Sequence, residues 1–199
     1  EVNDAMTLGV SGDEDDLAGF WNFNEGSGTS VIDQTSNENN GTISGDVSWS
    51  TDVPPILPVL GGNNSLSFDG EGDFVNFGGV DDVNLSTYTL MVWAKSDVFG
   101  SHQGIITNGS GTNQSIYGYN LNIDQELLVF NAAGVSEDTF LSYNMPMYEW
   151  HHVAISVDDS EKIAKMYIDG ILHKTKTYTG NSGNNYGVLQ FGGWNSWYL

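Results

Sequence analysis

The feature that most limits the possible folds of this chain is a series of short segments in which apolar residues recur at every second position. In SLSFDG, Leu66 and Phe68 share one side of an extended chain, and in DFVNFGG, Val75 and Phe77 do the same. A side-chain period of two predicts β-strands, and turn-forming Gly and Asn residues separate the segments. No sustained helical period is present, so the sequence predicts an all-β fold.

Two further segments, YTLMVWAK and QELLVFNAAG, carry apolar residues at both odd and even positions. Strands of this kind are covered on both faces. Many short strands with turns between them predict a two-sheet antiparallel sandwich rather than an alternation of strands and helices.

The stretch MYEWHHVAISVDDSEKIAKMYIDGIL contains two adjacent histidines, which suggest a metal or acid–base site. Neighbouring strand residues point to opposite faces, so His151 and His152 cannot ligate one ion together. We expect one face to carry Trp150, His152 and Ala154, and the other to carry His151, Val153, Ile155 and Val157. Asp169-Gly170 fits the two-residue type I′ turn of a hairpin. The stretch is therefore predicted to be structural.

The charge of the chain limits its partners. It has 26 acidic residues against 5 basic ones, all of them lysines, and a formal net charge of -21. Nucleic acids and anionic membranes are bound by Lys and Arg clusters, so neither is an expected partner. The absence of cysteine favours a bacterial or otherwise disulfide-independent protein.

Two regions are expected along the chain. Residues 1–16 are acidic, which is typical of a linker or tail, whereas residues 17–199 carry the strand pattern and form one domain. No apolar run approaches the ~20 residues of a membrane span. The chain begins at Glu1 without a signal peptide, and we expect it to be a mature or excised segment.

Five segments resemble, in order, the laminin-G-like, concanavalin A-like jelly rolls: LAGFWNFNEGSGTSVIDQTSNENNGTI, LSFDGEGDFVNF, YTLMVWAKS, EWHHVAISVDD and KMYIDGIL. From Leu17 to Leu199 the chain is most similar to the bacterial type found in secreted carbohydrate-active enzymes and surface adhesins. The resemblance implies two packed antiparallel sheets of six or seven strands each, one of them concave. It also implies that Trp21, Trp93 and Trp150 lie in the core.

Members of this family close with a further strand after the FGG segment, whereas this sequence stops at LQFGGWNSWYL. The resemblance therefore implies a jelly roll that lacks its final strand. A missing strand leaves unpaired backbone groups and exposed apolar surface. Two explanations are open: the sequence is part of a longer chain, or a partner segment completes the sheet by strand addition.

The sequence offers little for catalysis. Jelly-roll glycoside hydrolases need two carboxylates about 5–9.5 Å apart across the scissile bond. Glu71 and Asp73 lie among glycines and fit a loop, and Glu137 and Asp138 are adjacent and diverge. Lyases of this fold use arginine, and no Gly-x-Ser-x-Gly elbow occurs. We expect no enzymatic activity in this segment.

Calcium is the expected cofactor. The segment IDQTSNENNGT concentrates oxygen atoms on a loop, and calcium is a hard cation that prefers oxygen ligands. The predicted ligands are Asp33, Asn37 and Asn40. The alternative is an Asx-turn loop, in which the same side chains bind their own backbone.

Two segments predict a carbohydrate-binding surface, because aromatic rings stack on sugars while amides bind their hydroxyls. In NGSGTNQSIYGYN the candidates are Asn113, Tyr117 and Tyr119, and in GGWNSWY they are Trp194, Asn195 and Trp197. The alternative for the tyrosines is a place in the core, and for the tryptophans a place under the missing strand.

The sequence thus favours a non-catalytic, extracellular carbohydrate-binding or adhesion module of a larger secreted or cell-surface protein. Neutral glycans are the expected partners, because an acidic surface repels sulfated and uronate-rich polymers. The alternative is a structural or protein-binding spacer in a surface adhesin or filament, without a glycan site and completed by a strand from elsewhere. A fold alone does not separate these functions.

Overall fold

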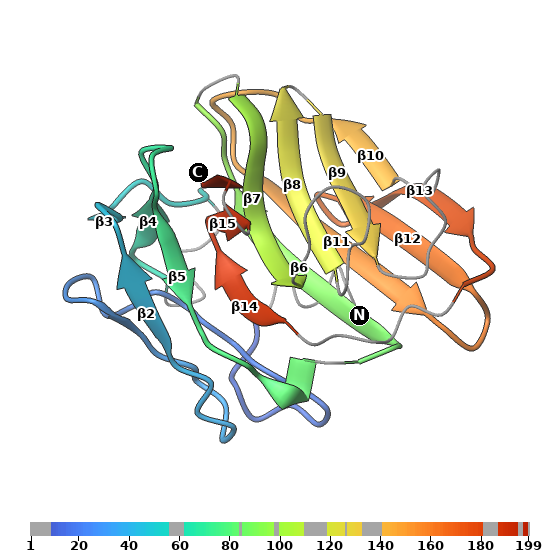
Figure 1. The fold of residues 1–199 in the computed structure, drawn as a ribbon, viewed down its shortest axis with the longest axis horizontal. Coiled ribbons are helices and arrows are strands. Elements are labelled where there is room, and N and C mark those ends of the chain that lie inside the picture. Colours follow the sequence, from blue (N-terminus) through green and yellow to red (C-terminus); the bar gives the residue numbers. More distant parts are fainter. Residues whose placement is uncertain are drawn as a thin grey trace.

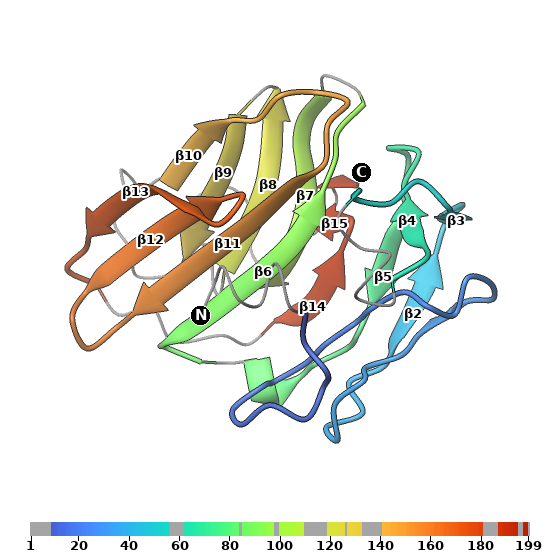
Figure 2. The same ribbon diagram turned by 180° about the vertical axis from the view of Figure 1, so that it is seen from behind.

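The computed structural model describes residues 9–55, 62–83, 85–97, 100–109, 119–125, 127–132, 141–180, 187–194 and 197–198. In this part of the chain the strands pair antiparallel, and the helical structure is one 3₁₀ turn, η2 (Asp81–Val83). Figure 1 and Figure 2 show two packed layers of strands from opposite sides. The predicted all-β class is confirmed.

The first layer is an eight-stranded sheet in the order β1-β2-β5-β14-β7-β8-β9-β10 (Figure 1). Its strands are β1 (Ser30–Val31), β2 (Gly41–Ser44), β5 (Phe74–Asn76), β7 (Gly100–Gly109), β8 (Tyr119–Gln125), β9 (Leu127–Ala132), β10 (Leu141–Asn144) and β14 (Val188–Phe191). Because β14 lies between β5 and β7, the end of the chain returns to the middle of this sheet.

The second layer consists of two separate sheets. Figure 2 shows the four-stranded sheet β13-β12-β11-β6 in front, with β3 and β4 beyond β6. The strands are β6 (Tyr88–Ala94), β11 (His151–Asp158), β12 (Ile163–Ile168) and β13 (Ile171–Thr177), and the pair β3 (Ser48–Ser50) and β4 (Ser65–Ser67). The layers thus have eight and four plus two described strands, instead of the six or seven expected in each.

The core lies between the layers and is formed by alternate strand residues. Val153, Ile155 and Val157 of β11 are at most 1% exposed and belong to one cluster with Leu121 of the opposite layer. Ala154 is equally buried but lies outside that cluster, because it points to the outer face. The facing predicted for this strand is confirmed.

The tryptophans divide between core and surface. Trp21 is half-buried and packs against the core cluster, with its ring centroid 4.9 Å from that of Phe77, which agrees with the expectation. The expectation is wrong for Trp93 and Trp150, which are not part of the core cluster. Trp93 pairs with His152 on the outer face of the four-stranded sheet, since the inward positions of β6 are taken by the residues on either side of it.

The hairpin between β12 and β13 has the predicted two-residue turn. Ile168 pairs with Ile171, and Asp169 and Gly170 between them have φ values of 50° and 77°. Positive φ at both central residues twists the turn in the sense that the two strands require.

Candidate functional site

The outer face of the eight-stranded sheet carries a row of uncharged polar residues. The strand register places one of them on each of seven neighbouring strands: Ser30, Thr42, Asn76, Gln190, Thr107, Asn120 and Asn131. We name these seven residues the polar row. At a strand spacing of ~4.8 Å the row extends over about 29 Å.

The side chains of six members of the polar row face away from the core, because the residues beside them face inward: Ser30, Thr42, Asn76, Gln190, Thr107 and Asn131. Val75 precedes Asn76 and Leu189 precedes Gln190, and both apolar residues belong to the core cluster. Ser30, Thr42 and Asn76 are exposed, and Gln190 and Asn131 are half-buried. The row presents amides and hydroxyls without a carboxylate, on a protein with 26 acidic residues.

A hairpin near the end of the chain crosses the polar row at Thr107, the fifth of its seven members. Its strands are β15 (Gly193–Trp194) and β16 (Trp197–Tyr198), and both lie against β7. The Thr107 hydroxyl donates a hydrogen bond of 2.8 Å to the Gly193 carbonyl, and Thr107 is only 2% exposed. Since Thr107 points outward, the hairpin lies on the outer face and divides the row into two parts.

The hairpin brings two of the predicted ligand-binding residues to the polar row. Trp194 and Trp197 are paired across it, in register. Asn113, Tyr117 and Asn195 lie outside the described residues, so their predicted role stays a prediction.

Tyr119 requires a correction. It begins β8 on the inward face, is 2% exposed, and its ring lies 5.1 Å from that of Tyr88. Burial raises the pKa of the Tyr119 hydroxyl. Tyr119 therefore belongs to the core, which was the alternative for this residue, and it cannot stack on a sugar at the surface.

The sequence did not reveal the polar row itself. Its members come from separate segments that meet only through the strand order of the sheet. The available signal was an amide at an outward position between apolar residues, as at Asn76 in FVNF and Gln190 in VLQF. That signal marks a solvent-facing strand position and does not specify which strands are neighbours.

The loop expected to bind calcium is held by its own hydrogen bonds. Asp33 Oδ1 accepts from the backbone N–H of Phe20 at 2.9 Å and of Thr35 at 3.0 Å. Asp33 Oδ2 accepts from the Thr35 hydroxyl at 2.8 Å and the Asn39 N–H at 3.0 Å. Four donors thus surround a carboxylate that is 5% exposed, and they occupy the positions a cation would need.

The other two predicted calcium ligands also bind the protein. The Asn37 side-chain amide donates to the carbonyls of Leu17 and Ala18, and Asn40 Oδ1 accepts from the Asp33 N–H. Asp33, Asn37 and Asn40 therefore do not fit a calcium site, and the Asx-turn alternative describes them. No group of three or more His, Cys, Asp or Glu residues in the described ranges is placed to hold a metal ion.

The adjacent histidines have separate structural roles. His151 Nδ1 lies 2.8 Å from the Asp169 carboxylate. His152 is 3% exposed and packs against Trp93 on the other face. Burial lowers the pKa of His152 to about 4, against a smaller opposing effect of Asp169, so its ring is neutral at pH 7. The prediction that this stretch is structural agrees with these contacts.

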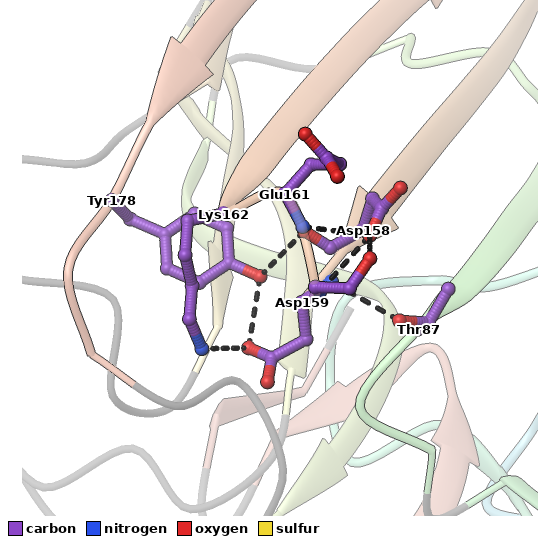
Figure 3. A network of polar contacts seen from close by, with 7 residues as sticks. Thr87, Asp158, Asp159, Glu161, Lys162 and Tyr178 are labelled. Atoms are coloured by element: carbon purple, nitrogen blue, oxygen red, sulfur yellow. Dashed lines mark hydrogen bonds and ion pairs between the residues drawn. The ribbon is translucent and has the colours of Figure 1, made fainter.

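A polar network surrounds the turn between β11 and β12 (Figure 3). The Asp158 carboxylate accepts from the backbone and hydroxyl of Ser160, and these bonds lower the pKa of Asp158. Asp159 Oδ1 lies 2.9 Å from Lys162 Nζ and accepts from the Tyr178 hydroxyl at 3.0 Å. Tyr178 follows β13, so the network ties the end of that strand to the turn and is structural.

No helix in the described ranges is long and apolar enough to cross a membrane. Among curated proteins, none matches the sequence of the chain.

Solved structures with the same fold include two toxin domains and one domain of a sugar-degrading enzyme. The binding domain of Paraclostridial Mosquitocidal Protein 1 has a TM-score of 0.59 at 14% identity, over 90% of this chain and 42% of its own. The binding domain of Botulinum Neurotoxin DC in complex with SialylT gives 0.55 at 17% identity, over 85% of this chain and 43% of its own.

The third structure is domain 4 of an extracellular GH43 arabinanase from Geobacillus stearothermophilus, in complex with arabinotriose. Its TM-score is 0.60 at 15% identity, over 88% of this chain and 82% of that domain. The chain thus spans less than half the length of the two toxin structures and most of the arabinanase domain. At such identities the likeness shows a shared fold.

The family follows from a sequence model as well as from the fold. The model of the concanavalin A-like lectin/glucanases superfamily named Laminin_G_3 matches residues 69–198, which include β5 to β16. The resemblance found in the sequence motifs is thereby confirmed. The chain belongs to the Laminin_G_3 family of the concanavalin A-like lectin/glucanases superfamily.

Proposed function

We propose that this domain is a non-catalytic carbohydrate-binding module of an extracellular protein and that it binds neutral glycans along the polar row. The observation that carries the proposal is the row itself, seven amide and hydroxyl residues in register on an otherwise acidic protein. Amides and hydroxyls both donate and accept hydrogen bonds, as sugar hydroxyls require, and none of them is charged.

Trp194 and Trp197 complete the proposed site. They pair across the hairpin that crosses the row, and aromatic rings stack on the apolar C–H faces of sugars. The solved arabinanase domain in complex with arabinotriose supports this reading, as does the toxin binding domain in complex with SialylT. The arabinanase is extracellular, which supports the same location for this protein.

Binding without hydrolysis is proposed because the row contains no carboxylate. Glycoside hydrolysis on this kind of fold uses a pair of carboxyl groups on either side of the scissile bond. Prolonged incubation with a bound oligosaccharide is expected to leave its chain length unchanged by mass spectrometry.

The test of the function is a glycan array with neutral, sulfated and uronate-containing glycans. Neutral glycans are expected to bind, and Trp194→Ala is expected to weaken that binding at least tenfold. Tyr148→Ala is the matched control, because Tyr148 is an aromatic residue 68% exposed outside the proposed site. A blank array with folded protein would favour the spacer function instead.

We also propose that one further strand, from a longer chain or a partner, fits between β4 and β6. The second layer is in two pieces, and β6 has one hydrogen-bonded neighbour among the described strands. Inward residues near this gap are only half-buried: Leu66, Phe68, Leu90 and Val92. An added strand would pair the open edge of β6 and cover these side chains.

Hydrogen exchange tests the strand proposal. In the 199-residue chain, amides of Tyr88–Ala94 that point away from β11 are expected to exchange quickly, and those bonded to β11 slowly. A chain that includes the strand is expected to protect both sets. Equal protection of both sets in the 199-residue chain would contradict the proposal.

Calcium is not part of the proposed site, because the Asp33 loop supplies its own hydrogen-bond donors. Melting curves with millimolar calcium and with EDTA are expected to coincide. A melting temperature that falls in EDTA would place a structural ion on other residues.

A further inference from the structure

The polar row is open along one part and covered at Thr107. Ser30, Thr42 and Asn76 are exposed and Gln190 is half-buried, whereas Thr107 on the next strand is 2% exposed. The change occurs between β14 and β7, where the hairpin of β15 and β16 lies on the sheet. What holds the hairpin there therefore decides how much of the row a ligand can reach.

Two residues of β7 form the seat of the hairpin. Thr107 donates its hydroxyl to the Gly193 carbonyl at 2.8 Å. Gly104 lies beneath the same peptide group: a Cβ atom at Gly104 would come within 2.9 Å of the Gly193 carbonyl oxygen and 3.0 Å of its carbon. A side chain at position 104 would thus push the hairpin away from the sheet.

The chain reaches this seat through a glycine that turns it over the sheet. Gly192 has a φ of 81°, and its N–H still donates to the Ile105 carbonyl at 3.2 Å. A Cβ at Gly192 would collide with the ring of Phe68 at 2.3 Å. The position therefore needs glycine for two reasons, its backbone conformation and its contact with Phe68.

We propose that Gly104 and Thr107 are positioning residues, which fix the hairpin across the polar row and end the ligand-accessible part of the row at Gln190. The proposal rests on the proposed function and adds its length specificity. A linear neutral oligosaccharide would bind on β1, β2, β5 and β14, with the hairpin closing one end of the site. This four-strand part extends over about 14 Å at the usual strand spacing, so sugar units beyond a short oligosaccharide find no further contacts.

The variants that test the seat are Gly104→Ala and Thr107→Val. Gly104 has no positive φ, so an alanine there is strained only by its contact with the Gly193 peptide group. Thr107→Val keeps the side-chain shape and removes the hydroxyl donor. Gly79→Ala is the matched control, because a Cβ at Gly79 meets nothing within 4 Å and its φ is not positive.

The first readout is hydrogen exchange of the amides of residues 193–198, which does not depend on any glycan. Both seat variants are expected to raise these exchange rates at least tenfold and to leave the exchange rates of the β11 amides unchanged. In the control Gly79→Ala, all amide exchange rates are expected to stay as in the unmodified chain. Unchanged rates in both seat variants would overturn the seat.

The second readout is binding of the tri- and hexasaccharides of four linear neutral glycans: arabinan, xylan, cellulose and amylose. The unmodified chain is expected to bind the tri- and hexasaccharide of its preferred glycan equally, within about twofold. In the seat variants the ratio of the dissociation constants for the trisaccharide and the hexasaccharide is expected to change at least fivefold.

The outcomes separate the two proposals. Faster exchange of the hairpin with an unchanged ratio would show that the hairpin does not limit the ligand, and would overturn the positioning role. If the unmodified chain binds none of the oligosaccharides and no neutral glycan on the array, the proposed function fails, while exchange still decides whether the seat exists.

Discussion

The two outer faces of the sandwich use the same backbone geometry for opposite chemistry. The eight-stranded sheet carries the polar row over seven strands. The four-stranded sheet carries a second row in register, Met91, Ala154, Tyr167 and Leu172, which we name the apolar row. Met91 and Leu172 are 39% and 51% exposed, whereas Ala154 between them is fully buried.

The positively charged residues are also divided unequally between the two sheets. All five lysines lie in the four-stranded sheet or directly beside its strands: Lys95, Lys162, Lys165, Lys174 and Lys176. Both sheets send apolar residues inward, because the core between them requires it. The outward positions are not constrained by the core. The residues on the two outer faces can therefore give this domain a function different from that of other domains with the same fold.

The largest effect is expected from converting the apolar row into a polar one. Ala154→Gln places a long polar side chain at a fully buried outward position between Met91 and Tyr167. Displaced neighbours and an unsatisfied amide should lower the free energy of unfolding by about 2–4 kcal/mol. For a chain of this size that corresponds to a melting temperature lower by about 4–16 °C.

Urea unfolding of Ala154→Gln and of Thr42→Gln gives the comparison. Thr42 is exposed in the polar row, so its variant should change the free energy of unfolding by less than about 0.5 kcal/mol. Equal effects of the two substitutions would mean that the two faces do not differ in packing.

A second difference between the faces is their response to pH. His152 lies on the outer face of the four-stranded sheet, and burial lowers its pKa to about 4, whereas the polar row has no titratable side chain. The unfolded chain binds the proton at pH below ~6.5, so stability should fall between pH 6.5 and pH 4 by up to about 3 kcal/mol. The loss is expected in this direction because folding depresses the pKa.

His152→Phe tests this assignment. The ring keeps its contact with Trp93, and the substitution removes the buried Nδ1 atom, which has no hydrogen-bond partner among the described residues. The variant should be at least as stable as the unmodified chain at pH 7 and lose less stability on acidification to pH 4.5. An identical pH profile would assign the acid sensitivity to other groups.

Much of the fold could be predicted from the sequence, because alternation is a local property. The opposite facing of Val153 and Ala154 and the turn at Asp169-Gly170 depend only on neighbouring residues, and both predictions are confirmed. Trp93 was misplaced for an instructive reason. The family resemblance implied a place in the core, although the inward positions of β6 are filled by the residues on either side of Trp93.

The candidate site was less predictable, because it depends on which strands are neighbours. Asn76 and Gln190 are 114 positions apart in the sequence, yet they are opposite each other in the sheet. The hydrogen bonds of the Asp33 loop were hard to predict for another reason: its oxygen atoms suit calcium, but Asp33 accepts from three donors within the motif and from the N–H of Phe20 outside it. The composition of a loop predicts which kind of metal its oxygen atoms would suit. It does not show whether N–H and hydroxyl groups of the protein already bind those oxygen atoms.

Glycan affinity should respond to one face and not to the other. The double variant Thr42→Val/Gln190→Ala removes two hydrogen-bonding side chains from the open part of the polar row. Each neutral hydrogen bond contributes about 0.5–1.5 kcal/mol, so loss of two should weaken binding by about 5-fold to 150-fold. Isothermal titration with the best neutral oligosaccharide from the array measures this change.

The matched control for that titration is Met91→Ser/Leu172→Ser, which changes two exposed members of the apolar row. Its affinity should stay within about twofold of the unmodified chain. The reverse result, with loss of binding in the control alone, would move the glycan site to the four-stranded sheet.

The smallest effect is expected where the two pieces of the second layer meet. Lys95, next to β6, forms an ion pair with Asp52, next to β3, and the Trp150 indole donates to the same carboxylate at 3.0 Å. The ion pair with Lys95, followed by the bond from Trp150, lowers the pKa of Asp52. The Asp52 carboxylate therefore stabilises the folded protein at pH values above the pKa that Asp52 has in the unfolded chain. This stabilisation is lost as the pH falls through the lowered pKa of the folded state.

Because Asp52 is half exposed, water and salt screen this pair, and Lys95→Met should lower the free energy of unfolding by less than about 1 kcal/mol. The effect should decrease further in high salt, and Lys165→Met on the outer face of β12 serves as the control. A loss above about 2 kcal/mol, independent of salt, would mean that packing of the lysine stem holds β6 to the β3–β4 pair. In that case the two pieces form one continuous surface, and no additional strand is needed between them.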